Sequence, residues 1–272
     1  MLDILNSQYP SVMGVLNVTP DSFSDAGKFV GLEEAKKQAD RMISGGASII
    51  DIGGESTRPG ADFVGESEEL DRVIPVIEIL KNMTDMPISI DTSKVNVMRE
   101  AISAGASMIN DVLALRDPGA LDLVASLQIP VCLMHMQGSP KNMQQSPTYD
   151  DVNCDVASFL KKRAEKCIES GIPKEFIIID PGFGFGKTDN QNIELLANLR
   201  KLKALGFPIL IGLSRKSTLG KITGRNINDR LPTSIASAVI GFLNGANIIR
   251  AHDVRETVDA LKFANAVMEM SL

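Results

Sequence analysis

Eight short apolar segments, placed at regular intervals, constrain the fold of this chain most strongly. They are rich in Ile and Val, and apolar and polar residues do not alternate within them. The segments are residues 12–18, 48–54, 87–92, 107–112, 130–136, 176–181, 208–214 and 247–253. Continuous apolar segments of this length are typical of strands that are buried on both faces of a parallel sheet. The pattern therefore predicts eight parallel strands.

Segments with helical spacing lie between the predicted strands, for example residues 31–46, 68–83 and 150–171. Several end in a glycine just before the next strand, and glycine readily adopts the left-handed conformation that closes a helix. Eight strands that alternate with about eight helices predict an α/β fold, a single (β/α)8 TIM barrel over residues 1–272. A doubly wound open sheet is the alternative, but it usually has fewer strands or a second domain. The chain has no Pro/Gly/Ser-rich linker that would mark a domain boundary.

Composition argues against several classes of function. A formal net charge of −6 gives no general attraction to DNA, RNA or anionic membranes. The absence of Trp and the presence of only two Tyr leave little aromatic surface for stacking bases. We therefore expect no nucleic-acid partner, and because no run of about 18 apolar residues occurs, no membrane span. The first ten residues lack the layout of a signal peptide, and three widely spaced cysteines favour a reducing cytoplasm over a disulfide framework.

A weak internal repeat indicates where a site would lie. The segments GASIID, GASMIN and GANIIR each begin with Gly-Ala, continue as an apolar run and end in a polar residue, respectively Asp51, Asn110 and Arg250. Other apolar runs end in Asn17, Asp91, Asp180 and Ser214. In a barrel these C-terminal strand ends converge on one face, where active sites are found. The repeat therefore predicts a polar site at this face.

The loops that follow two of the predicted strands also carry chemical groups. Residues 17–29 form a polar loop that is longer than most strand-to-helix connections, which favours a functional role. The amide oxygen of Asn17 suits a hard cation such as Mg²⁺. Residues 53–63 are rich in glycine and include Arg58, which could clamp a phosphate with two hydrogen bonds.

Residues 180–188 read DPGFGFGKT and resemble two phosphate-binding motifs without matching either. Pro181 stands where a Walker A loop needs glycine, and Lys187 interrupts a G-x-G-x-x-G pattern. We expect these glycines to let the backbone fold close to a ligand, with Phe183 and Phe185 as apolar walls. Packing of both rings in the core is an equal alternative on composition alone.

The last two predicted strands end in GLSRKS and IIRAHDV. Arg215 and Lys216 are expected to place two cations at the barrel mouth. Arg250 and His252 are two residues apart, so in a strand both side chains point to the same side. The only other histidine, His135, is three residues from Cys132, which argues against a chelating pair, and no zinc-ligand spacing occurs.

These residues form two groups with different chemistry. Arg58, Arg250 and His252 suit an oxyanion or a diphosphate. Asp91, Asn110, Asp180 and Lys216 are hydrogen-bonding groups at strand ends. Carboxylates pair well with an N–C–NH₂ edge, which donates two parallel hydrogen bonds. The residues therefore predict binding of a polar, nitrogen-rich heterocycle together with a phosphate, and they leave the reaction open.

At these same positions the sequence resembles the dihydropteroate synthase family. The matching segments are GVLNVTPDSFSD, IIDIGGESTRPGA, SIDTSK, INDV, LMHMQGSPKNMQ, DPGFGFGK, GLSRKS and IIRAHDV, in the family's order over residues 12–254. Ala26 and Ala251 stand where many relatives have Gly and Val. The resemblance implies a transferase of folate biosynthesis. It would join 6-hydroxymethyl-7,8-dihydropterin diphosphate to p-aminobenzoate, giving 7,8-dihydropteroate and pyrophosphate with Mg²⁺, by a dissociative, carbocation-like mechanism.

The resemblance also implies roles for individual residues. The groups expected to carry catalysis are Asp91, Asp180, Lys216, Arg250 and His252. The pterin-binding residues are Asp91, Asn110, Asp180 and Lys216, with Met134 as an apolar contact. The diphosphate site is Arg58, Arg250 and His252, with Asn17 as the Mg²⁺ ligand. The p-aminobenzoate pocket is Thr57, Pro59, Phe185 and Ser217. Phe23 and Asp25 resemble parts of a loop that closes over the reaction.

The family is typically dimeric through barrel helices away from the mouth, and the apolar segment 231–245 could contribute to a homodimer. Two other functions stay open: a pterin-binding methyltransferase that uses methyltetrahydrofolate, and a paralogue that binds pterin without turnover. Arg58, Lys216 and the Arg250/His252 pair favour the synthase, because a methyltransferase needs no site for a diphosphate.

Overall fold

The structure is a computed structural model that describes residues 4, 9–19, 28–56, 63–138, 143–144 and 147–270. Within these ranges every predicted apolar segment contains a strand, so the prediction of eight parallel strands is confirmed. The strands are β1 (Ser11–Asn17), β2 (Ile49–Gly53), β3 (Ile88–Asp91), β4 (Met108–Asp111), β5 (Val131–Met134), β6 (Ile177–Asp180), β7 (Leu210–Ile211) and β8 (Ile248–Ala251).

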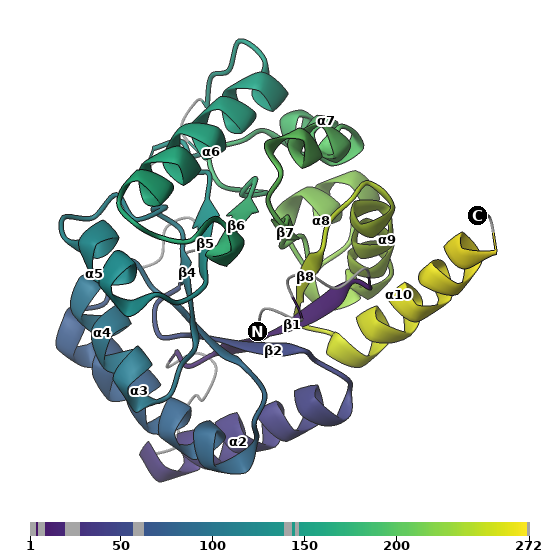
Figure 1. The fold of residues 1–272 in the computed structure, drawn as a ribbon. Helices are drawn as coiled ribbons and strands as arrows, with labels where there is room; N and C mark the ends of the chain where they lie inside the picture. The colour runs from purple at the N-terminus through teal and green to yellow at the C-terminus, as the bar shows by residue number, and fades with distance from the viewer. Residues whose placement is uncertain are drawn as a thin grey trace.

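The strands form one parallel sheet that curls into a barrel (Figure 1). Neighbouring strands follow the order β6-β5-β4-β3-β2-β1-β8-β7. The two ends of this order meet where Ile179 of β6 forms a parallel bridge with Ile209, next to β7. There the Ile179 N–H donates to the Pro208 carbonyl at 3.0 Å. This contact completes the ring and rules out the open doubly wound sheet.

Each strand is followed by a helix on the outside of the barrel, and β7 is followed by two (Figure 1). The helices are α2 (Lys28–Ser44), α3 (Glu66–Met83), α4 (Val95–Ala104), α5 (Ala120–Leu127), α6 (Val152–Glu169), α7 (Asp189–Ala197), α8 (Ser217–Thr223), α9 (Leu231–Leu243) and α10 (Val254–Glu269). Short 3₁₀ helices are η2 (Lys174–Phe176), η3 (Leu199–Leu205) and η4 (Ile227–Asp229). Among the described residues, no helix has the length and apolar character needed to cross a bilayer.

The glycines before five of the strands confirm their predicted role. Gly46, Gly105, Gly171, Gly206 and Gly245 have φ angles from 73° to 123°. A side chain makes this left-handed region unfavourable, whereas glycine enters it at little cost. Each therefore turns the chain from an outer helix back toward the barrel.

The barrel interior is built in layers, and this places the site. An apolar layer contains one side chain from each of seven strands: Met13, Ile49, Met108, Cys132, Ile178, Leu210 and Ile248. Side chains two residues apart in a strand point the same way. The next layer toward the C-terminal strand ends therefore includes Asp51, Asp91, Asn110, Met134, Asp180 and Arg250, together with Val15 of β1. Predominantly polar side chains thus lie directly above an apolar floor, while the outward residues pack under the helices.

Candidate active site

The centre of the polar layer is the guanidinium of Arg250, which binds two carboxylates. Its Nε donates to Asp51 Oδ2 at 2.6 Å, and its Nη2 donates to Asp91 Oδ2 at 2.8 Å. The Nδ2 of Asn110 donates to the same Asp51 oxygen at 3.1 Å. Strands β2, β3, β4 and β8 therefore each place one side chain in a single hydrogen-bonded network.

Burial in this layer changes how the acids titrate. Desolvation raises the pKa of Asp91 to about 7, against the opposing attraction of Arg250. It also raises the pKa of Asp180, which the Gly182 N–H and the positive charge of Lys216 oppose. For Arg250, the neighbouring carboxylates of Asp51 and Asp91 outweigh desolvation and raise its pKa further. Because shifted acids and bases gather at functional sites, the layer has the electrostatic character of an active site.

Asp180 and Lys216 lie at the opposite side of the mouth. One Asp180 oxygen accepts from the Gly182 N–H at 2.7 Å. The Nζ of Lys216 donates to the Phe183 carbonyl and lies 4.4 Å from the centre of the Phe185 ring. Desolvation lowers the pKa of Lys216 to about 8. The structure therefore brings Asp180, Lys216 and Phe185 together, as the sequence suggested.

An apolar cluster borders these polar groups. Met134, at the end of β5, packs with Val112, Met136 and Met143, and Phe185 packs against them. Phe183 lies instead in the main core and is 1% exposed. The two phenylalanines of the glycine-rich loop therefore have different roles. Phe185 lines the mouth, and Phe183 anchors the loop in the core.

The glycine-rich loop is held by a buried lysine. The Nζ of Lys187 donates to the carbonyls of Gly182 (2.8 Å) and Phe185 (3.0 Å) and lies 2.9 Å from Nδ1 of His135. Desolvation lowers the pKa of Lys187 to about 7 and that of His135 to about 2. The backbone of Gly186 passes so close to Gln137 that a side chain has no space, and its φ is +62°.

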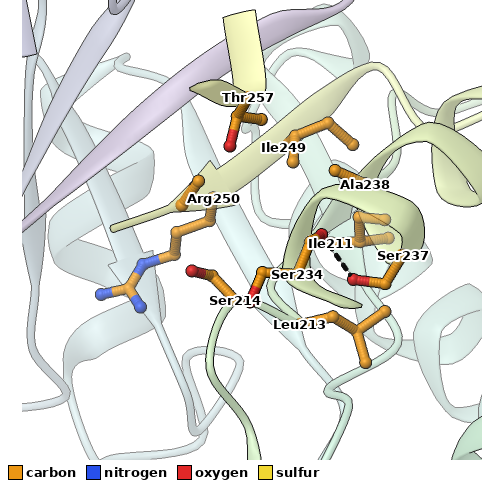
Figure 2. Close-up of a pocket in the computed structure, with 10 residues that line it drawn as sticks. Ile211, Leu213, Ser214, Ser234, Ser237, Ala238, Ile249, Arg250 and Thr257 are labelled. Carbon is orange, nitrogen blue, oxygen red and sulfur yellow. Dashed lines mark hydrogen bonds between the residues drawn. The ribbon is translucent and has the colours of Figure 1, made fainter. Parts of the chain in front are cut away.

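The end of β8 is joined to the loop after β7. The His252 N–H donates to Ser214 Oγ at 3.1 Å, and His252 Nδ1 lies 3.0 Å from the same oxygen. Figure 2 shows Ser214 and Arg250 beside a small cavity that is also lined by Ser234 and Ser237 of α9. In this view the Arg250 guanidinium points away from the α9 side chains.

Arg215 has a different role from the one expected. Its guanidinium donates to both carboxylate oxygens of Asp253, so its charge is balanced next to His252 rather than added to the mouth. Arg215 also has a positive φ of 59°, and its N–H donates to Ser234 Oγ. The pairing joins the loops after β7 and β8 and thereby supports Lys216 and His252.

Two further predicted residues lie at the rim. Asn17 is the last residue of β1 and faces Gly53, where its Oδ1 would lie 3.7 Å from an added Cβ. Ser217 begins α8 and, with Gly184 and Lys221, lines an open groove of about 450 Å³. The remaining predicted residues, Phe23, Asp25, Thr57, Arg58 and Pro59, lie outside the described residues.

Sequence reasoning did not select two residues that the structure places at the centre of this region. Asp51 is fully buried and joins Arg250 to Asn110. The sequence does contain a signal for Asp51, because Asp51, Asn110 and Arg250 each end one copy of the Gly-Ala repeat. Lys187 was considered only as a mismatch to phosphate-binding motifs. In the sequence Lys187 is a lysine that follows three closely spaced glycines, and this pattern does not indicate that its side chain is buried.

The described residues contain no cluster of three or more His, Cys, Asp or Glu side chains that could hold a metal ion. A metal here would need ligands beyond such a cluster, for example an amide oxygen together with a substrate. The three cysteines are free thiols; Cys132 and Cys167 are buried, and Cys154 is exposed.

Comparison with known proteins agrees with this arrangement. Residues 13–252 match the family model described as pterin binding enzyme. The dihydropteroate synthase of Escherichia coli K12 is 50% identical over 264 residues, covering 97% of this chain and 94% of the relative.

Two solved structures are similar over 96% of this chain. The Yersinia pestis dihydropteroate synthase in a sulfonamide complex is 51% identical with a TM-score of 0.92, and 95% of that chain is covered. The Xanthomonas albilineans enzyme with 4-aminobenzoic acid is 51% identical with a TM-score of 0.91, and 94% of that chain is covered. Such identity over nearly the full length of both partners shows that the chain belongs to the dihydropteroate synthase family, transferases of folate biosynthesis.

Proposed function

We propose that the polar layer binds 6-hydroxymethyl-7,8-dihydropterin diphosphate and that its methylene carbon is transferred to the amine of p-aminobenzoate. The observation that carries this assignment is the charge of the layer. Three acidic side chains, Asp51, Asp91 and Asp180, face two basic ones, Arg250 and Lys216, above an apolar floor, so acidic groups outnumber basic ones. A buried negative site favours a cationic pterin fragment over a neutral one.

The pterin ring would lie between the polar groups and the apolar cluster. Asp180 would accept hydrogen bonds from the N–C–NH₂ edge, since a carboxylate offers two parallel acceptors. Asn110 would accept through its amide oxygen, because its nitrogen already donates to Asp51. Met134 and Phe185 would contact the ring faces, and Lys216 would exchange its bond to Phe183 for one to the ring.

The diphosphate would extend toward Arg250 and His252. Arg250 has five N–H donors, and two of them bind Asp51 and Asp91. The remaining donors are available to an anion. Ser214 orients the His252 ring through Nδ1, so the other ring nitrogen, Nε2, points away from Ser214. Arg58 would complete this set from the loop after β2.

The reaction follows from these positions. The C–O bond between the methylene and the diphosphate breaks, and its electron pair leaves with pyrophosphate. The carbocation is delocalised into the electron-rich dihydropterin and stabilised by Asp91 and Asp180. The arylamine then forms the new C–N bond, and the resulting ammonium releases a proton to water. No residue needs to act as an activated nucleophile.

Mg²⁺ fits this site as an ion whose coordination is completed by substrate. The amide oxygen of Asn17 is a hard ligand at the rim, and Mg²⁺ is commonly held by one or two protein oxygens with substrate phosphates and water. When bound, Mg²⁺ would neutralise charge on the departing diphosphate. The protein's own contribution is to hold Asn17 at the end of β1, beside Gly53 and Asp91.

We place p-aminobenzoate beside Phe185 and Ser217, next to the open groove after β6 and β7. Thr57 and Pro59 would contribute from the loop after β2. The bound 4-aminobenzoic acid of the Xanthomonas albilineans relative supports this substrate class. The free cysteines are compatible with the reducing cytoplasm in which we place the enzyme.

We also propose that a second copy of the chain covers an apolar face on α9 and α10. Ile240 and Leu243 of α9 and Phe263 and Val267 of α10 are exposed, with Phe263 exposed by 74%. Exposed apolar residues gathered on adjoining helices are typical of an interface. Sedimentation of the wild type as a dimer and of Phe263→Glu as a monomer would support a homodimer; a monomeric wild type would rule it out.

The function is tested by pyrophosphate release from the pterin diphosphate with Mg²⁺, with and without p-aminobenzoate. We expect release that depends on p-aminobenzoate and equals dihydropteroate formation. Pterin binding without release would indicate a paralogue that has lost turnover. Transfer of a methyl group from methyltetrahydrofolate, without pyrophosphate release, would indicate the methyltransferase.

A further inference from the structure

The carboxylate of Asp51 lies below the groups to which we assign substrate binding. It is fully buried, so a ligand in the mouth has no access to it. Its Oδ2 accepts from both Arg250 Nε (2.6 Å) and Asn110 Nδ2 (3.1 Å). Its Oδ1 has no hydrogen-bond partner among the described residues. We infer that Asp51 is a positioning residue that fixes the polarity of Asn110 and the plane of Arg250, an inference that rests on the proposed function.

For Asn110, Asp51 decides which end of the side-chain amide faces the mouth. An ionised carboxylate can only accept hydrogen bonds, so the atom of Asn110 that faces Asp51 must be its nitrogen. The amide oxygen is consequently directed away from Asp51, and no described residue donates to it. Asp51 therefore makes Asn110 an acceptor for a ring N–H. Without the carboxylate, the amide could turn and present its donor instead.

For Arg250, Asp51 helps to fix the orientation of the guanidinium plane. Asp51 of β2 binds Nε, and Asp91 of β3 binds Nη2 of the same guanidinium. Two carboxylates held by different strands leave the plane little freedom to rotate, so the remaining N–H groups keep a fixed direction. Figure 2 shows this side chain extending from β8 away from α9. Asp51 supplies the partner that no substrate could replace, because it lies beneath the mouth.

The unpartnered Oδ1 supports a functional reason for this carboxylate. A buried polar atom without a hydrogen bond lowers stability, and such atoms are rare in native structures. An amide or an apolar side chain at this position would remove the burial of a negative charge. A carboxylate, however, accepts hydrogen bonds from both Arg250 and Asn110 and donates to neither. Only such a group can orient both side chains in the way that the site needs.

The test is the isosteric substitution Asp51→Asn, measured with two separate ligands. Binding of 6-hydroxymethylpterin, which lacks the diphosphate, reports on Asn110, and binding of inorganic pyrophosphate with Mg²⁺ reports on Arg250. We expect each dissociation constant to rise about tenfold or more, the effect of losing a charge-assisted hydrogen bond. In steady-state kinetics the KM for the pterin diphosphate should rise while the KM for p-aminobenzoate stays unchanged.

The chain offers a matched control in its outer layer. Between α6 and α7, Asn153 Nδ2 donates to Glu194 Oε1 at 2.7 Å, and Asn153 Oδ1 is buried without a partner among the described residues. Glu194→Gln makes the same carboxylate-to-amide change opposite an asparagine amide, at an exposed carboxylate away from the mouth. We expect it to leave both dissociation constants and both KM values at wild-type levels. An equal loss in the two variants would assign Asp51 a structural role only.

A double variant separates the two functions of Asp51. In Asp51→Asn/Asn110→Asp the introduced amide donates to the introduced carboxylate, whose second oxygen is again an acceptor at the mouth. Pterin affinity should recover relative to Asn110→Asp alone, where two carboxylates face each other. Pyrophosphate affinity should stay weak, because Arg250 has lost its partner at position 51. This comparison also covers the case in which Asp51→Asn alone does not fold.

The outcomes distinguish this inference from the proposed function. A wild-type protein that binds neither pterin nor pyrophosphate would overturn the proposed function itself. Wild-type binding of both ligands together with unchanged constants in Asp51→Asn would overturn only the role of Asp51. Recovery of both ligands in the double variant would likewise contradict it, since Arg250 would then not depend on position 51.

Discussion

Two cations in the barrel, Arg250 and Lys187, have opposite surroundings. Arg250 binds the carboxylates of Asp51 and Asp91, and these charges raise its pKa although desolvation opposes them. Lys187 binds two backbone carbonyls and lies beside Nδ1 of a histidine, and desolvation lowers its pKa to about 7. One cation is matched by full negative charges, whereas the other is held mainly by dipoles.

The barrel therefore uses one cation to bind a ligand and the other to hold its own backbone. A cation with carboxylate partners keeps its charge and, with free N–H groups left, can bind an anion. A lysine whose donors all point at its own chain has nothing left for a ligand; it fixes the loop of residues 180–188 instead. Arg250 should therefore control activity, and Lys187 should control stability.

Removal of Arg250 should have the largest effect. In Arg250→Ala the diphosphate loses a bidentate partner in a buried site, and kcat/KM for the pterin diphosphate should fall by about 100-fold to 1,000-fold. Steady-state kinetics by pyrophosphate release would measure this. The kcat/KM of Arg250→Lys should lie between those of the wild type and Arg250→Ala, because lysine keeps the charge but lacks the planar guanidinium. If Arg250→Ala keeps wild-type kinetics, the assignment of the diphosphate site is wrong.

Asp180→Asn should produce the next largest effect. The introduced amide oxygen can still accept from the Gly182 N–H, so the loop should keep its conformation. The negative charge that pairs with the pterin edge is lost, and the dissociation constant for 6-hydroxymethylpterin should rise about tenfold to 100-fold. Titration calorimetry would measure it. Affinity for pyrophosphate serves as the internal control and should change little; a parallel loss of both ligands would point to a general disturbance of the mouth.

Much of the fold could be predicted because the relevant signals are local. Eight apolar segments and the glycines before the strands determined the barrel, and each has a direct physical reason in strand burial or in positive φ. The strands are shorter than most of the apolar segments, whose last residues lie in the loops that follow, where the Thr92 and Ser214 hydroxyls accept hydrogen bonds from loop N–H groups. Strand β7, with two residues, deviates most.

The candidate site could be predicted only where polarity and strand position coincide. Asp91, Asn110, Asp180 and Arg250 were selected because each ends an apolar run. Asp51 ends one too, but its function depends on its two partners, and such partners are set by the register between strands. Arg215 was expected at the mouth, and only the position of Asp253 across the barrel rim shows that its charge is balanced there. Pairing of this kind is tertiary and leaves no local sequence pattern.

Lys187→Met should lower stability and leave the chemistry largely intact. Methionine fills a similar volume, but the carbonyls of Gly182 and Phe185 lose their donor. Leaving two buried carbonyls without partners, offset in part by removing a desolvated amine, should cost about 1–3 kcal/mol in the free energy of unfolding. Urea denaturation near pH 7 would measure it. A hundredfold loss of kcat with unchanged stability would contradict the separation of the two cations.

The difference in stability between the wild type and Lys187→Met should also depend on pH. The folded pKa of Lys187 is lowered to about 7 from its ordinary value of 10.5, so between these values the unfolded chain binds a proton that the folded chain does not. The contribution of Lys187 to stability should therefore rise with pH across this window, by at most about 1.4 kcal/mol per pH unit. Below pH 7 it should level off, since both states are then protonated.

Other groups near the mouth titrate in the same range, so the quantity to measure is the difference between the wild type and Lys187→Met from pH 7 to pH 10. Lys216 and Asp91 are present in both proteins, and their contributions largely cancel. A difference that grows in favour of the wild type as the pH rises would confirm a desolvated amine without a carboxylate partner. A flat difference would mean that Lys187 keeps an ordinary pKa, and the contrast with Arg250 would then lie in geometry alone.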